Sequence, residues 1–352
     1  MKTRIVLMSM IIGVWANLAT ATPVWFGKPH AARVLRINSS LDLASFAPLL
    51  ERFVALNPDI RVSYLDVNTF ELYQKTILEK NNPSASLVIS SAMDLQLKLI
   101  NDGYGQTYTS PVTAQLPSDA KWRDQVFAFS LEPVVMLVNK DQYPGKLPQD
   151  RQDLLRTIRQ YEEQMTGKIG TYDIRRSGVG YLLASQDARQ ADATWGRLIE
   201  AFGSHQLQTY CCTHEIIDDV ASGKLLLGYN LLGSYASQRA RLDSRLEMIL
   251  PKDYTLMVMR VALIPKHASN KGDAGRFLDF LLSNEVQGMM QTKALLFPIR
   301  PDVTPVITPY VVEATGPKRA IELDQQLLVG RDYAKQRRFI SSWEIAQEMK
   351  PK

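Results

Sequence analysis

Arg33-Val-Leu-Arg-Ile-Asn-Ser-Ser40 sets the fold class, because apolar and polar residues alternate along it as in a β-strand and the hydroxyl pair Ser39-Ser40 then starts a helix. Residues 41–56 carry apolar side chains at helical spacing, and Asn57-Pro58 stops that helix. The alternation continues along the chain, with strands at 60–67 and 86–90 and helices at 70–79 and 93–101. It predicts an α/β fold whose mostly parallel sheet is flanked by helices.

Hydroxyl pairs follow two of these strands. Ser39-Ser40 lies at the carboxyl end of the first strand, and Ser90-Ser91 lies at the carboxyl end of the third. Ligands of open α/β sheets bind beyond the carboxyl ends of the strands. We therefore expect both pairs to face a binding cleft.

A long apolar strand at 126–139 is interrupted by Pro133, which cannot donate to a sheet and predicts a bend or an edge position. We interpret it as the first crossing between two lobes, with Glu132 near the cleft, and a strand at 255–264 as the return. The predicted organisation is a signal peptide at 1–21, a first lobe at 33–131 plus 260–303, a second lobe at 132–259, and a helical tail at 304–352 that packs on the first lobe and has a helix from Arg319.

The segment Arg176-Ser-Gly-Val-Gly180 gathers a cation, a hydroxyl and two glycines between a short predicted strand and a helix. The first turn of a helix exposes unpaired N–H groups, and Gly178 and Gly180 allow a ligand close to that backbone. With Ser177 as N-cap or ligand hydroxyl, the segment predicts an anion cradle. The alternative is a plain turn and helix cap with Arg175 and Arg176 solvated.

Four turns of this kind occur where strands give way to helices, and two come from each predicted lobe. They are Ser39-Ser40, Ser90-Ser91, Ser177–Gly180 and Ser234-Tyr235. If the lobes face one another across a hinge, these turns meet in one cleft. Their backbone N–H and hydroxyl groups would then surround a small anion.

The ends and the charge of the chain indicate secretion. Met-Lys-Thr-Arg precedes an apolar run at 5–15 and the small residues Ala19-Thr-Ala21, which is typical of a signal peptide cleaved after Ala21. The apolar run is shorter than a membrane span. There is no cysteine near the expected cleavage site, so a lipid anchor is not expected. The formal charge of +5 is mild, and basic clusters with interleaved aromatics are missing, so nucleic acid is not an expected partner.

The two cysteines are the neighbours Cys211 and Cys212, which can close a strained vicinal ring or stay reduced; we expect two free, partly buried thiols. Only His214 lies close by, so no metal site is expected. A Gly-x-Ser-x-Gly elbow is missing, and the four histidines are scattered. We therefore expect no catalytic residues, no enzyme activity and no cofactor.

Residues 223–236, together with Leu250-Pro-Lys-Asp-Tyr-Thr255, Arg260–Lys266 and Phe277–Leu282, resemble the periplasmic solute-binding proteins of ABC importers. The similarity lies with the type II branch that includes ferric-ion-binding proteins and binders of phosphosugars and phosphoglycerate, and it spans residues 33–303. It implies two α/β lobes joined by two crossing strands that close around a solute. It also implies delivery of the solute to a membrane permease.

The resemblance also implies site residues. Iron-binding members carry two adjacent tyrosines in the equivalent of 234–235, where this chain has Ser234 before Tyr235, which argues against iron. The hydroxyl and glycine turns with Arg176 instead suit a phosphate or carboxylate. The cleft candidates carried over are Ser39, Ser40, Ser90, Ser91, Ser177, Gly178, Tyr229, Asn230, Ser234 and Tyr235, with Cys212 and Thr213 at a ligand-facing helix start.

The resulting hypothesis is a monomeric periplasmic protein that binds a small anionic organic solute by lobe closure and hands it to an ABC permease. A sensing module that docks on a sensor kinase shares this fold and remains an alternative. A ferric-ion-binding protein is a third reading. A secreted hydrolase has the least support, because no nucleophile is paired with a base.

Overall fold

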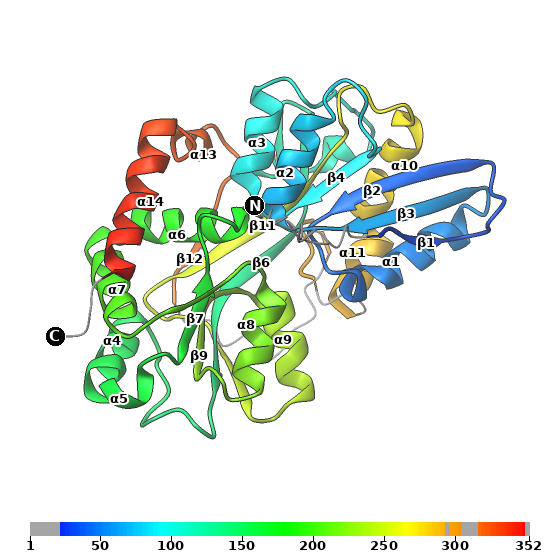
Figure 1. Cartoon of the computed structure of the whole chain (residues 1–352). Helices are drawn as coiled ribbons and strands as arrows, with labels where there is room; N and C mark the ends of the chain where they lie inside the picture. The colour runs from blue at the N-terminus through cyan, green and yellow to red at the C-terminus, as the bar shows by residue number, and fades with distance from the viewer. Residues whose placement is uncertain (1–21, 293–295, 301, 304–315, 349–352) are drawn as a thin grey trace, which may run out of the picture.

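The computed structural model describes residues 22–292, 296–300, 302–303 and 316–348. The expected signal peptide at 1–21 and residues 304–315 of the tail lie outside the described residues. Figure 1 shows two groups of strands and helices joined by long strands that pass between them. This arrangement confirms the predicted two-lobed α/β fold.

The first lobe is built on three parallel strands. β2 (Arg33–Ser39) lies between β3 (Ile60–Asp66) and β4 (Leu87–Ser90), and β1 (Val24–Phe26), which the sequence analysis missed, adds antiparallel to β3. Each parallel strand is followed by a helix, namely α1 (Leu43–Leu56), α2 (Thr69–Leu78) and α3 (Met93–Asn101). The three carboxyl ends of the strands therefore meet at one edge, as the chain rhythm predicted.

Aromatic packing fixes α1 against the return segment of the chain. Phe53 of α1 lies edge-to-face on Phe277 of α10 (Lys271–Leu282), with ring centroids 4.8 Å apart. Phe46 and Phe277 are both fully buried, with ring centroids 6.2 Å apart. Burial of such rings is worth about 2–3 kcal/mol each, so the return segment is an integral part of the first lobe.

Two antiparallel strands connect the lobes. β6 (Val126–Asn139) pairs with β11 (Thr255–Leu263) over Val126–Pro133 and then with β9 (Leu227–Leu232) from Val134 onward. Pro133 stands where the partner changes, which suits a residue that has no N–H to donate. β6 and β11 are the two crossing strands predicted from the sequence.

The second lobe repeats the pattern of the first. β7 (Ile169–Tyr172) lies parallel to both β8 (Gln208–Tyr210) and β9, and β10 (Leu246–Ile249) pairs antiparallel with β6. Its helices are α4 (Arg151–Gln160), α5 (Glu162–Met165), α6 (Gly178–Gln190), α7 (Asp192–Ser204), α8 (Thr213–Ala221) and α9 (Gly233–Leu242). The remaining elements are β5 (Lys121–Trp122) and α11 (Asn284–Thr292).

The tail differs from expectation. Lys318–Ala320 form a strand, β12, parallel to β11, where a helix from Arg319 was predicted. α13 (Gln326–Val329) packs on α3 of the first lobe, but α14 (Tyr333–Gln347) packs on α7 of the second, as Figure 1 shows. A Cβ on Gly203 of α7 would lie 1.7 Å from the carbonyl of Ala346, so glycine permits this contact. The prediction that the whole tail packs on the first lobe is therefore wrong for α14.

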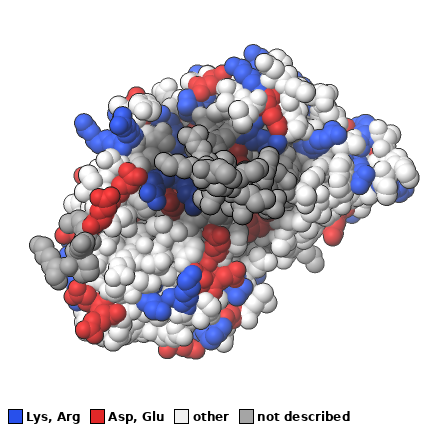
Figure 2. Space-filling model, viewed as in Figure 1, with Lys and Arg blue, Asp and Glu red and all other residues white. Residues whose placement is uncertain are grey.

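Among the described residues, no helix is both long and apolar enough to cross a bilayer. Lys and Arg occur together with Asp and Glu over the face seen in Figure 2. This mixture agrees with the mild net charge of the sequence.

Candidate functional site

A pocket of about 460 Å³ lies between the two lobes, a volume within the usual range for small-molecule sites. The first lobe contributes the polar residues Ser40, Asp42, Asp66, Asn68, Thr69, Glu71 and Ser91. The second lobe contributes Tyr172, Cys211, Cys212, Thr213, His214 and Tyr235. Both sets lie at the carboxyl ends of strands or in the first turns of the following helices, where sheet topology places ligand sites.

Five predicted residues line this pocket: Ser40, Ser91, Cys212, Thr213 and Tyr235. The hydroxyl of Tyr235 accepts a hydrogen bond from the backbone N–H of Asp42 at 3.1 Å. The hydroxyls of Thr213 and Tyr172 are 2.6 Å apart. These residues, predicted from their positions at strand ends or helix starts, therefore lie together at one cleft.

Ser39 and Ser90 stand behind the pocket wall and hold its turns. The Ser39 hydroxyl accepts the N–H of Leu41 at 3.0 Å, and the Ser90 hydroxyl accepts the N–H of Ala92 at 3.1 Å. Both side chains are fully buried. They shape the cleft and are outside the set of residues that line it.

The predicted anion cradle at 176–180 is occupied by the protein itself. The N–H groups of Gly178 and Val179 donate to the hydroxyl of Thr69, at 2.9 and 3.2 Å, and Ser177 caps α6 by accepting from Gly180. A Cβ on Gly178 would lie 2.6 Å from Leu95, and one on Gly180 would lie 2.3 Å from the Cβ of Tyr172. The glycines therefore allow close packing, and the first turn of α6 contacts the first lobe.

Arg176 does not reach the pocket. It is exposed on the turn before α6 and is absent from the residues that line the cavity. The hypothesis that its guanidinium binds the solute is contradicted by this position, because the helix turn points Ser177 and Gly178 inward instead. The alternative, a helix cap with Arg176 solvated, describes this segment.

Tyr229 and Asn230 belong to a separate buried network in the second lobe. The Tyr229 hydroxyl donates to Asp187 at 2.7 Å and accepts from Arg151 at 2.8 Å, and the Asn230 amide donates to Asp187 at 3.0 Å. Arg151 also pairs directly with Asp187 at 2.9 Å, and both side chains are 1% exposed. The network is fully enclosed, so these two candidates stabilise the lobe rather than line the cleft.

Glu132 and Ser234 lie at the crossing strands, beneath Tyr235. Glu132 pairs with Arg260 at 2.7 Å and accepts hydrogen bonds from the backbone N–H and the hydroxyl of Ser234. The Arg260 guanidinium lies 5.0 Å from the centre of the Tyr235 ring. A buried ion pair thus fixes the start of α9 and the ring that borders the pocket.

Three carboxylates of the pocket, Asp42, Asp66 and Glu71, were not predicted from the sequence. Loss of hydration raises the pKa of Asp42, and it raises the pKa of Asp66 to about 6, with the charge of Asp42 adding to the effect. Asp66 ends β3 and Asp42 follows the Ser39-Ser40 turn, so both occupy strand ends. Their position in the strand–helix rhythm was the signal that could have identified them.

The cysteine prediction is wrong, because Cys211 and Cys212 form a vicinal disulfide. The pair borders the pocket at the start of α8, with Cys212 as N-cap residue. The amide of Asn68 in the first lobe donates to the carbonyl of Cys211 at 3.3 Å and lies 3.7 Å from the sulfur of Cys212. The disulfide turn is therefore one of the contacts between the lobes.

The described residues provide little for a metal ion. The side chains of Cys211, Cys212 and Glu215 are the group whose possible ligand atoms come within 4.8 Å of one another. The two sulfur atoms are bonded to each other, which removes the thiolates that a soft metal requires. The arrangement of this cleft thus suits an organic solute better than an ion held by several side chains.

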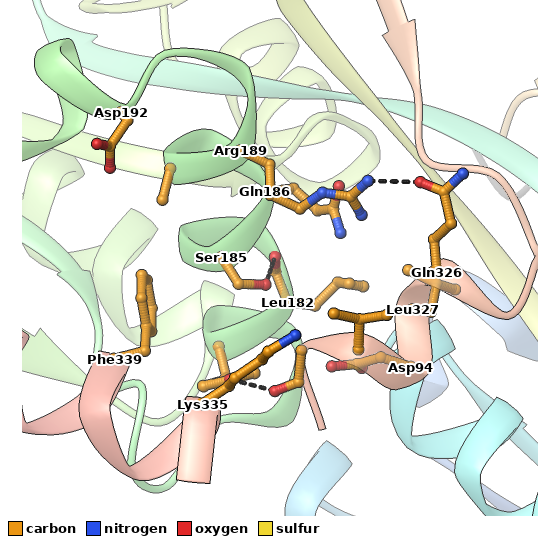
Figure 3. Close-up of a pocket in the computed structure, with 14 residues that line it drawn as sticks. Asp94, Leu182, Ser185, Gln186, Arg189, Asp192, Gln326, Leu327, Lys335 and Phe339 are labelled. Atoms are coloured by element: carbon orange, nitrogen blue, oxygen red, sulfur yellow. Dashed lines mark hydrogen bonds between the residues drawn. The ribbon is translucent and has the colours of Figure 1, made fainter. Parts of the chain in front are cut away.

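A second pocket of about 450 Å³ lies where the tail meets both lobes. Figure 3 shows Leu182 and Arg189 of α6 facing Gln326 and Leu327 of α13 across it, with the Arg189 side chain donating to Gln326 at 2.7 Å. Asp94 of α3 and Phe339 of α14 complete opposite sides. Its described lining residues belong to helices and their flanking turns and not to strand ends, so its position differs from that expected for the ligand site of an α/β sheet.

Comparisons with known proteins agree with this geometry. Residues 82–337 match the family of bacterial extracellular solute-binding proteins. The substrate-binding protein of an ABC transporter from Agrobacterium tumefaciens is 34% identical, with a TM-score of 0.87, and the match covers 93% of this chain and 98% of that one. A search of curated proteins finds no match.

More distant structures share the fold. AfuA from Actinobacillus pleuropneumoniae, solved with exogenous fructose 6-phosphate bound, is 20% identical, with a TM-score of 0.71 and coverage of 90% and 99%. A ferric-binding protein from Campylobacter jejuni is 17% identical, with a TM-score of 0.69 and coverage of 89% and 99%. Because the family model spans most of the chain and the Agrobacterium protein aligns over nearly all of it, the chain belongs to the bacterial extracellular solute-binding proteins, which bind solutes and are not enzymes.

Proposed function

We propose that this protein is the periplasmic solute-binding component of an ABC importer and captures a small organic solute with an anionic group in the pocket between its lobes. The Agrobacterium relative is a substrate-binding protein of such a transporter. The loaded protein would deliver its solute to an ABC permease in the inner membrane. The work of the protein is binding and closure, without chemistry.

The observation that carries this proposal is a pocket whose two walls come from different lobes and whose rims are joined by hydrogen bonds. Thr69 of the first lobe accepts from the first turn of α6 on one side. Asp42 donates to Tyr235 on another, and the Ser45 hydroxyl donates to Gln238 at 3.3 Å. A solute between these contacts would be enclosed, so binding and lobe closure are coupled.

The start of α8 is the best place for the anionic group. Cys212, the N-cap residue, makes no side-chain capping hydrogen bond, and Thr213 and His214 of the first turn line the pocket. Free N–H groups and the helix dipole favour an anion there. Hydroxyl groups elsewhere on the solute would donate to the carboxylates of the first lobe, an arrangement compatible with a phosphosugar such as the one bound to AfuA.

Isothermal titration of the mature protein against fructose 6-phosphate, phosphoglycerate and dicarboxylates tests the proposal. We expect binding of at least one compound, with a loss of affinity for Thr213→Val, which removes the hydroxyl at the start of α8. Thr166→Val, on the exposed surface after α5, is the matched control. Lack of binding across the panel would contradict the anionic solute.

A ferric ion is the second candidate, because Asp42, Asp66 and Tyr235 line the pocket with hard oxygen ligands and His214 adds an imidazole nitrogen. Tyr235 is poorly suited to bind iron, because its hydroxyl already accepts a hydrogen bond from the backbone N–H of Asp42. Burial also raises the pKa of Tyr235, which disfavours the phenolate that iron requires. Iron bound by a phenolate gives a coloured protein. A protein that remains colourless after loading with ferric citrate would dismiss this candidate.

A further inference from the structure

We propose that the solute also carries a protonated amine, and that Asp42 and Asp66 of the first lobe bind this amine while the start of α8 binds the anionic group. The inference rests on the proposed function, because it specifies the chemistry of the same pocket. It makes the solute a small zwitterion. The pocket lies between the two lobes, and the carboxylates on its first-lobe wall would determine what it selects.

The charges that line the pocket are unbalanced. Asp42, Asp66 and Glu71 all lie on the first-lobe wall, and none of the described residues on either wall is a lysine or an arginine. Among the described residues that line the pocket, His214 can become cationic, and it lies on the opposite wall. A pocket built for an anion alone would leave the carboxylates to repel it.

Asp42 and Asp66 have hydrogen-bonding capacity left for a ligand. Asp66 accepts the backbone N–H of Leu43 at 3.1 Å, and neither aspartate has an ion-pair partner among the described residues. The pKa of Asp66 rises to about 6 through lost hydration and the neighbouring Asp42 charge. Two carboxylates that destabilise each other are stabilised when a cation lies between them.

The nearest buried cation does not compensate for these charges. Arg260 attracts Asp42 and Asp66 from below the pocket, but its guanidinium is bound by Glu132 and covered by the Tyr235 ring. The Glu132 carboxylate thus neutralises Arg260 within the hinge. His214 on the opposite wall attracts both aspartates, but the pKa of Asp42 and that of Asp66 stay raised, which leaves room for a cation from the solute.

The positions of the charges favour an ammonium group over a metal ion. The ligand atoms of Asp42, Asp66 and His214 are absent from the described groups that come within 4.8 Å of one another. An ammonium with three donors spans separated carboxylates, whereas a small metal ion requires them to converge. Because the carboxylates belong to the first lobe and α8 to the second, a zwitterion would also connect the two lobes electrostatically.

Matched pairs of compounds test this inference. The mature protein is titrated calorimetrically with phosphoethanolamine against glycol phosphate, and with γ-aminobutyrate against γ-hydroxybutyrate, so that each pair differs only in ammonium or hydroxyl. We expect the amine to bind about tenfold or more tightly than its partner, because a hydrogen bond to a charged group is stronger than one between neutral groups. Equal affinity within the pairs would overturn the inference.

Variants of Asp42 and Asp66 test whether these carboxylates cause the preference for the amine. Asp66→Asn and Asp42→Asn keep the size of the side chain and remove its charge, so each should abolish most of the amine preference. Asp119→Asn, at an exposed position remote from the pocket, is the control and should leave it unchanged. A preference that survives in both pocket variants would contradict the assignment.

The outcome also separates this inference from the proposed function. If the phosphosugar panel binds and the amines show no preference, the importer function stands and the zwitterion does not. If neither series binds, native mass spectrometry of the protein purified from its host decides: a retained zwitterion with an amine supports the inference, and a retained solute without an amine overturns it. If no solute is retained either, both proposals fail.

Discussion

The hydroxyl of Thr69 accepts hydrogen bonds from the backbone N–H groups of Gly178 and Val179, which joins the start of α2 in the first lobe to the start of α6 in the second. Thr69 is buried, so the bonds are protected from water. The first turn of a helix normally offers these N–H groups to water or a ligand. In this protein the two N–H groups instead hold the two lobes in their observed relative position.

Thr69→Val should weaken solute binding about fivefold to tenfold. The change removes the acceptor of two hydrogen bonds between the lobes, each worth about 0.5–1.5 kcal/mol. Part of the lost free energy would destabilise the closed form, which is the form that binds the solute. Isothermal titration measures the affinity, and small-angle scattering of the ligand-free protein should show a larger radius of gyration. Thr76→Val, which alters a hydroxyl bonded within α2, is the control. Unchanged affinity and radius would show that these bonds do not hold the lobes together.

Asp66→Asn should raise the melting temperature of the ligand-free protein near neutral pH. The folded state holds the pKa of Asp66 at about 6, above its ordinary value of 3.8, so it binds this proton more tightly than the unfolded state does. The contribution of Asp66 therefore stabilises the protein as the pH falls from above 6 toward 4, and ionised Asp66 destabilises it at higher pH.

The test compares melting curves at about pH 7.5 and about pH 5. The gap between the variant and the parent protein should narrow at the lower pH, because the parent carboxyl is then protonated. Asn retains an oxygen that can accept the N–H of Leu43, so the hydrogen bond is kept. A gap that widens on acidification would contradict the raised pKa.

The vicinal disulfide should affect binding through the turn before α8. We expect no thiol that reacts with iodoacetamide in the native, oxidised protein and two after reduction, measured as mass shifts. Reduction, or the change Cys211→Ser with Cys212→Ser, should lower solute affinity because Asn68 contacts both the carbonyl of Cys211 and the sulfur of Cys212. Two alkylated cysteines without prior reduction would show that the pair is a dithiol.

Tyr229→Phe should destabilise the protein and leave solute affinity unchanged. The hydroxyl is bound to Arg151 and Asp187 inside the second lobe, and its removal leaves buried charged groups short of a partner at a cost of about 1–3 kcal/mol. Urea unfolding measures the loss, and titration measures the affinity. Tyr161→Phe, a half-buried tyrosine of the same lobe, serves as control. If Tyr229→Phe lowers solute affinity more than Tyr161→Phe does, the Tyr229 hydroxyl contributes to solute binding and the prediction is wrong.

The fold was accessible from the sequence because hydrophobic periodicity marks strands and helices locally. β6 was predicted with its observed ends, and the strand–helix rhythm of 33–101 gave the order of the first lobe. Lys318–Ala320 was mistaken for part of a helix because its strand conformation depends on pairing with β11, which no local pattern records.

The site was only partly accessible, since position at a strand end does not determine which way a side chain points. Ser40, Ser91, Thr213 and Tyr235 line the pocket, whereas the equally suggestive Ser39 and Ser90 hold turns. Glycines and an arginine at 176–180 were interpreted as an anion cradle, yet packing against Leu95 and Tyr172 explains the glycines. Asp42, Asp66 and Glu71 were not predicted, because the hydroxyl and glycine turns indicated an anionic ligand, and carboxylates repel an anion.

The C-terminal tail adds a third mechanical link to the two crossing strands. β12 pairs beside β11 as a parallel strand, and α14 packs on α7. Arg331 pairs with Asp94 of α3 at 2.7 Å and stacks 4.3 Å over the Tyr181 ring of α6. Any rotation that widens the solute cleft must therefore also shear the contacts on which α13 and α14 rest. Because Arg331 contacts Asp94 of the first lobe and the Tyr181 ring of the second, such a rotation would distort at least one of these two contacts, at a distance from the pocket.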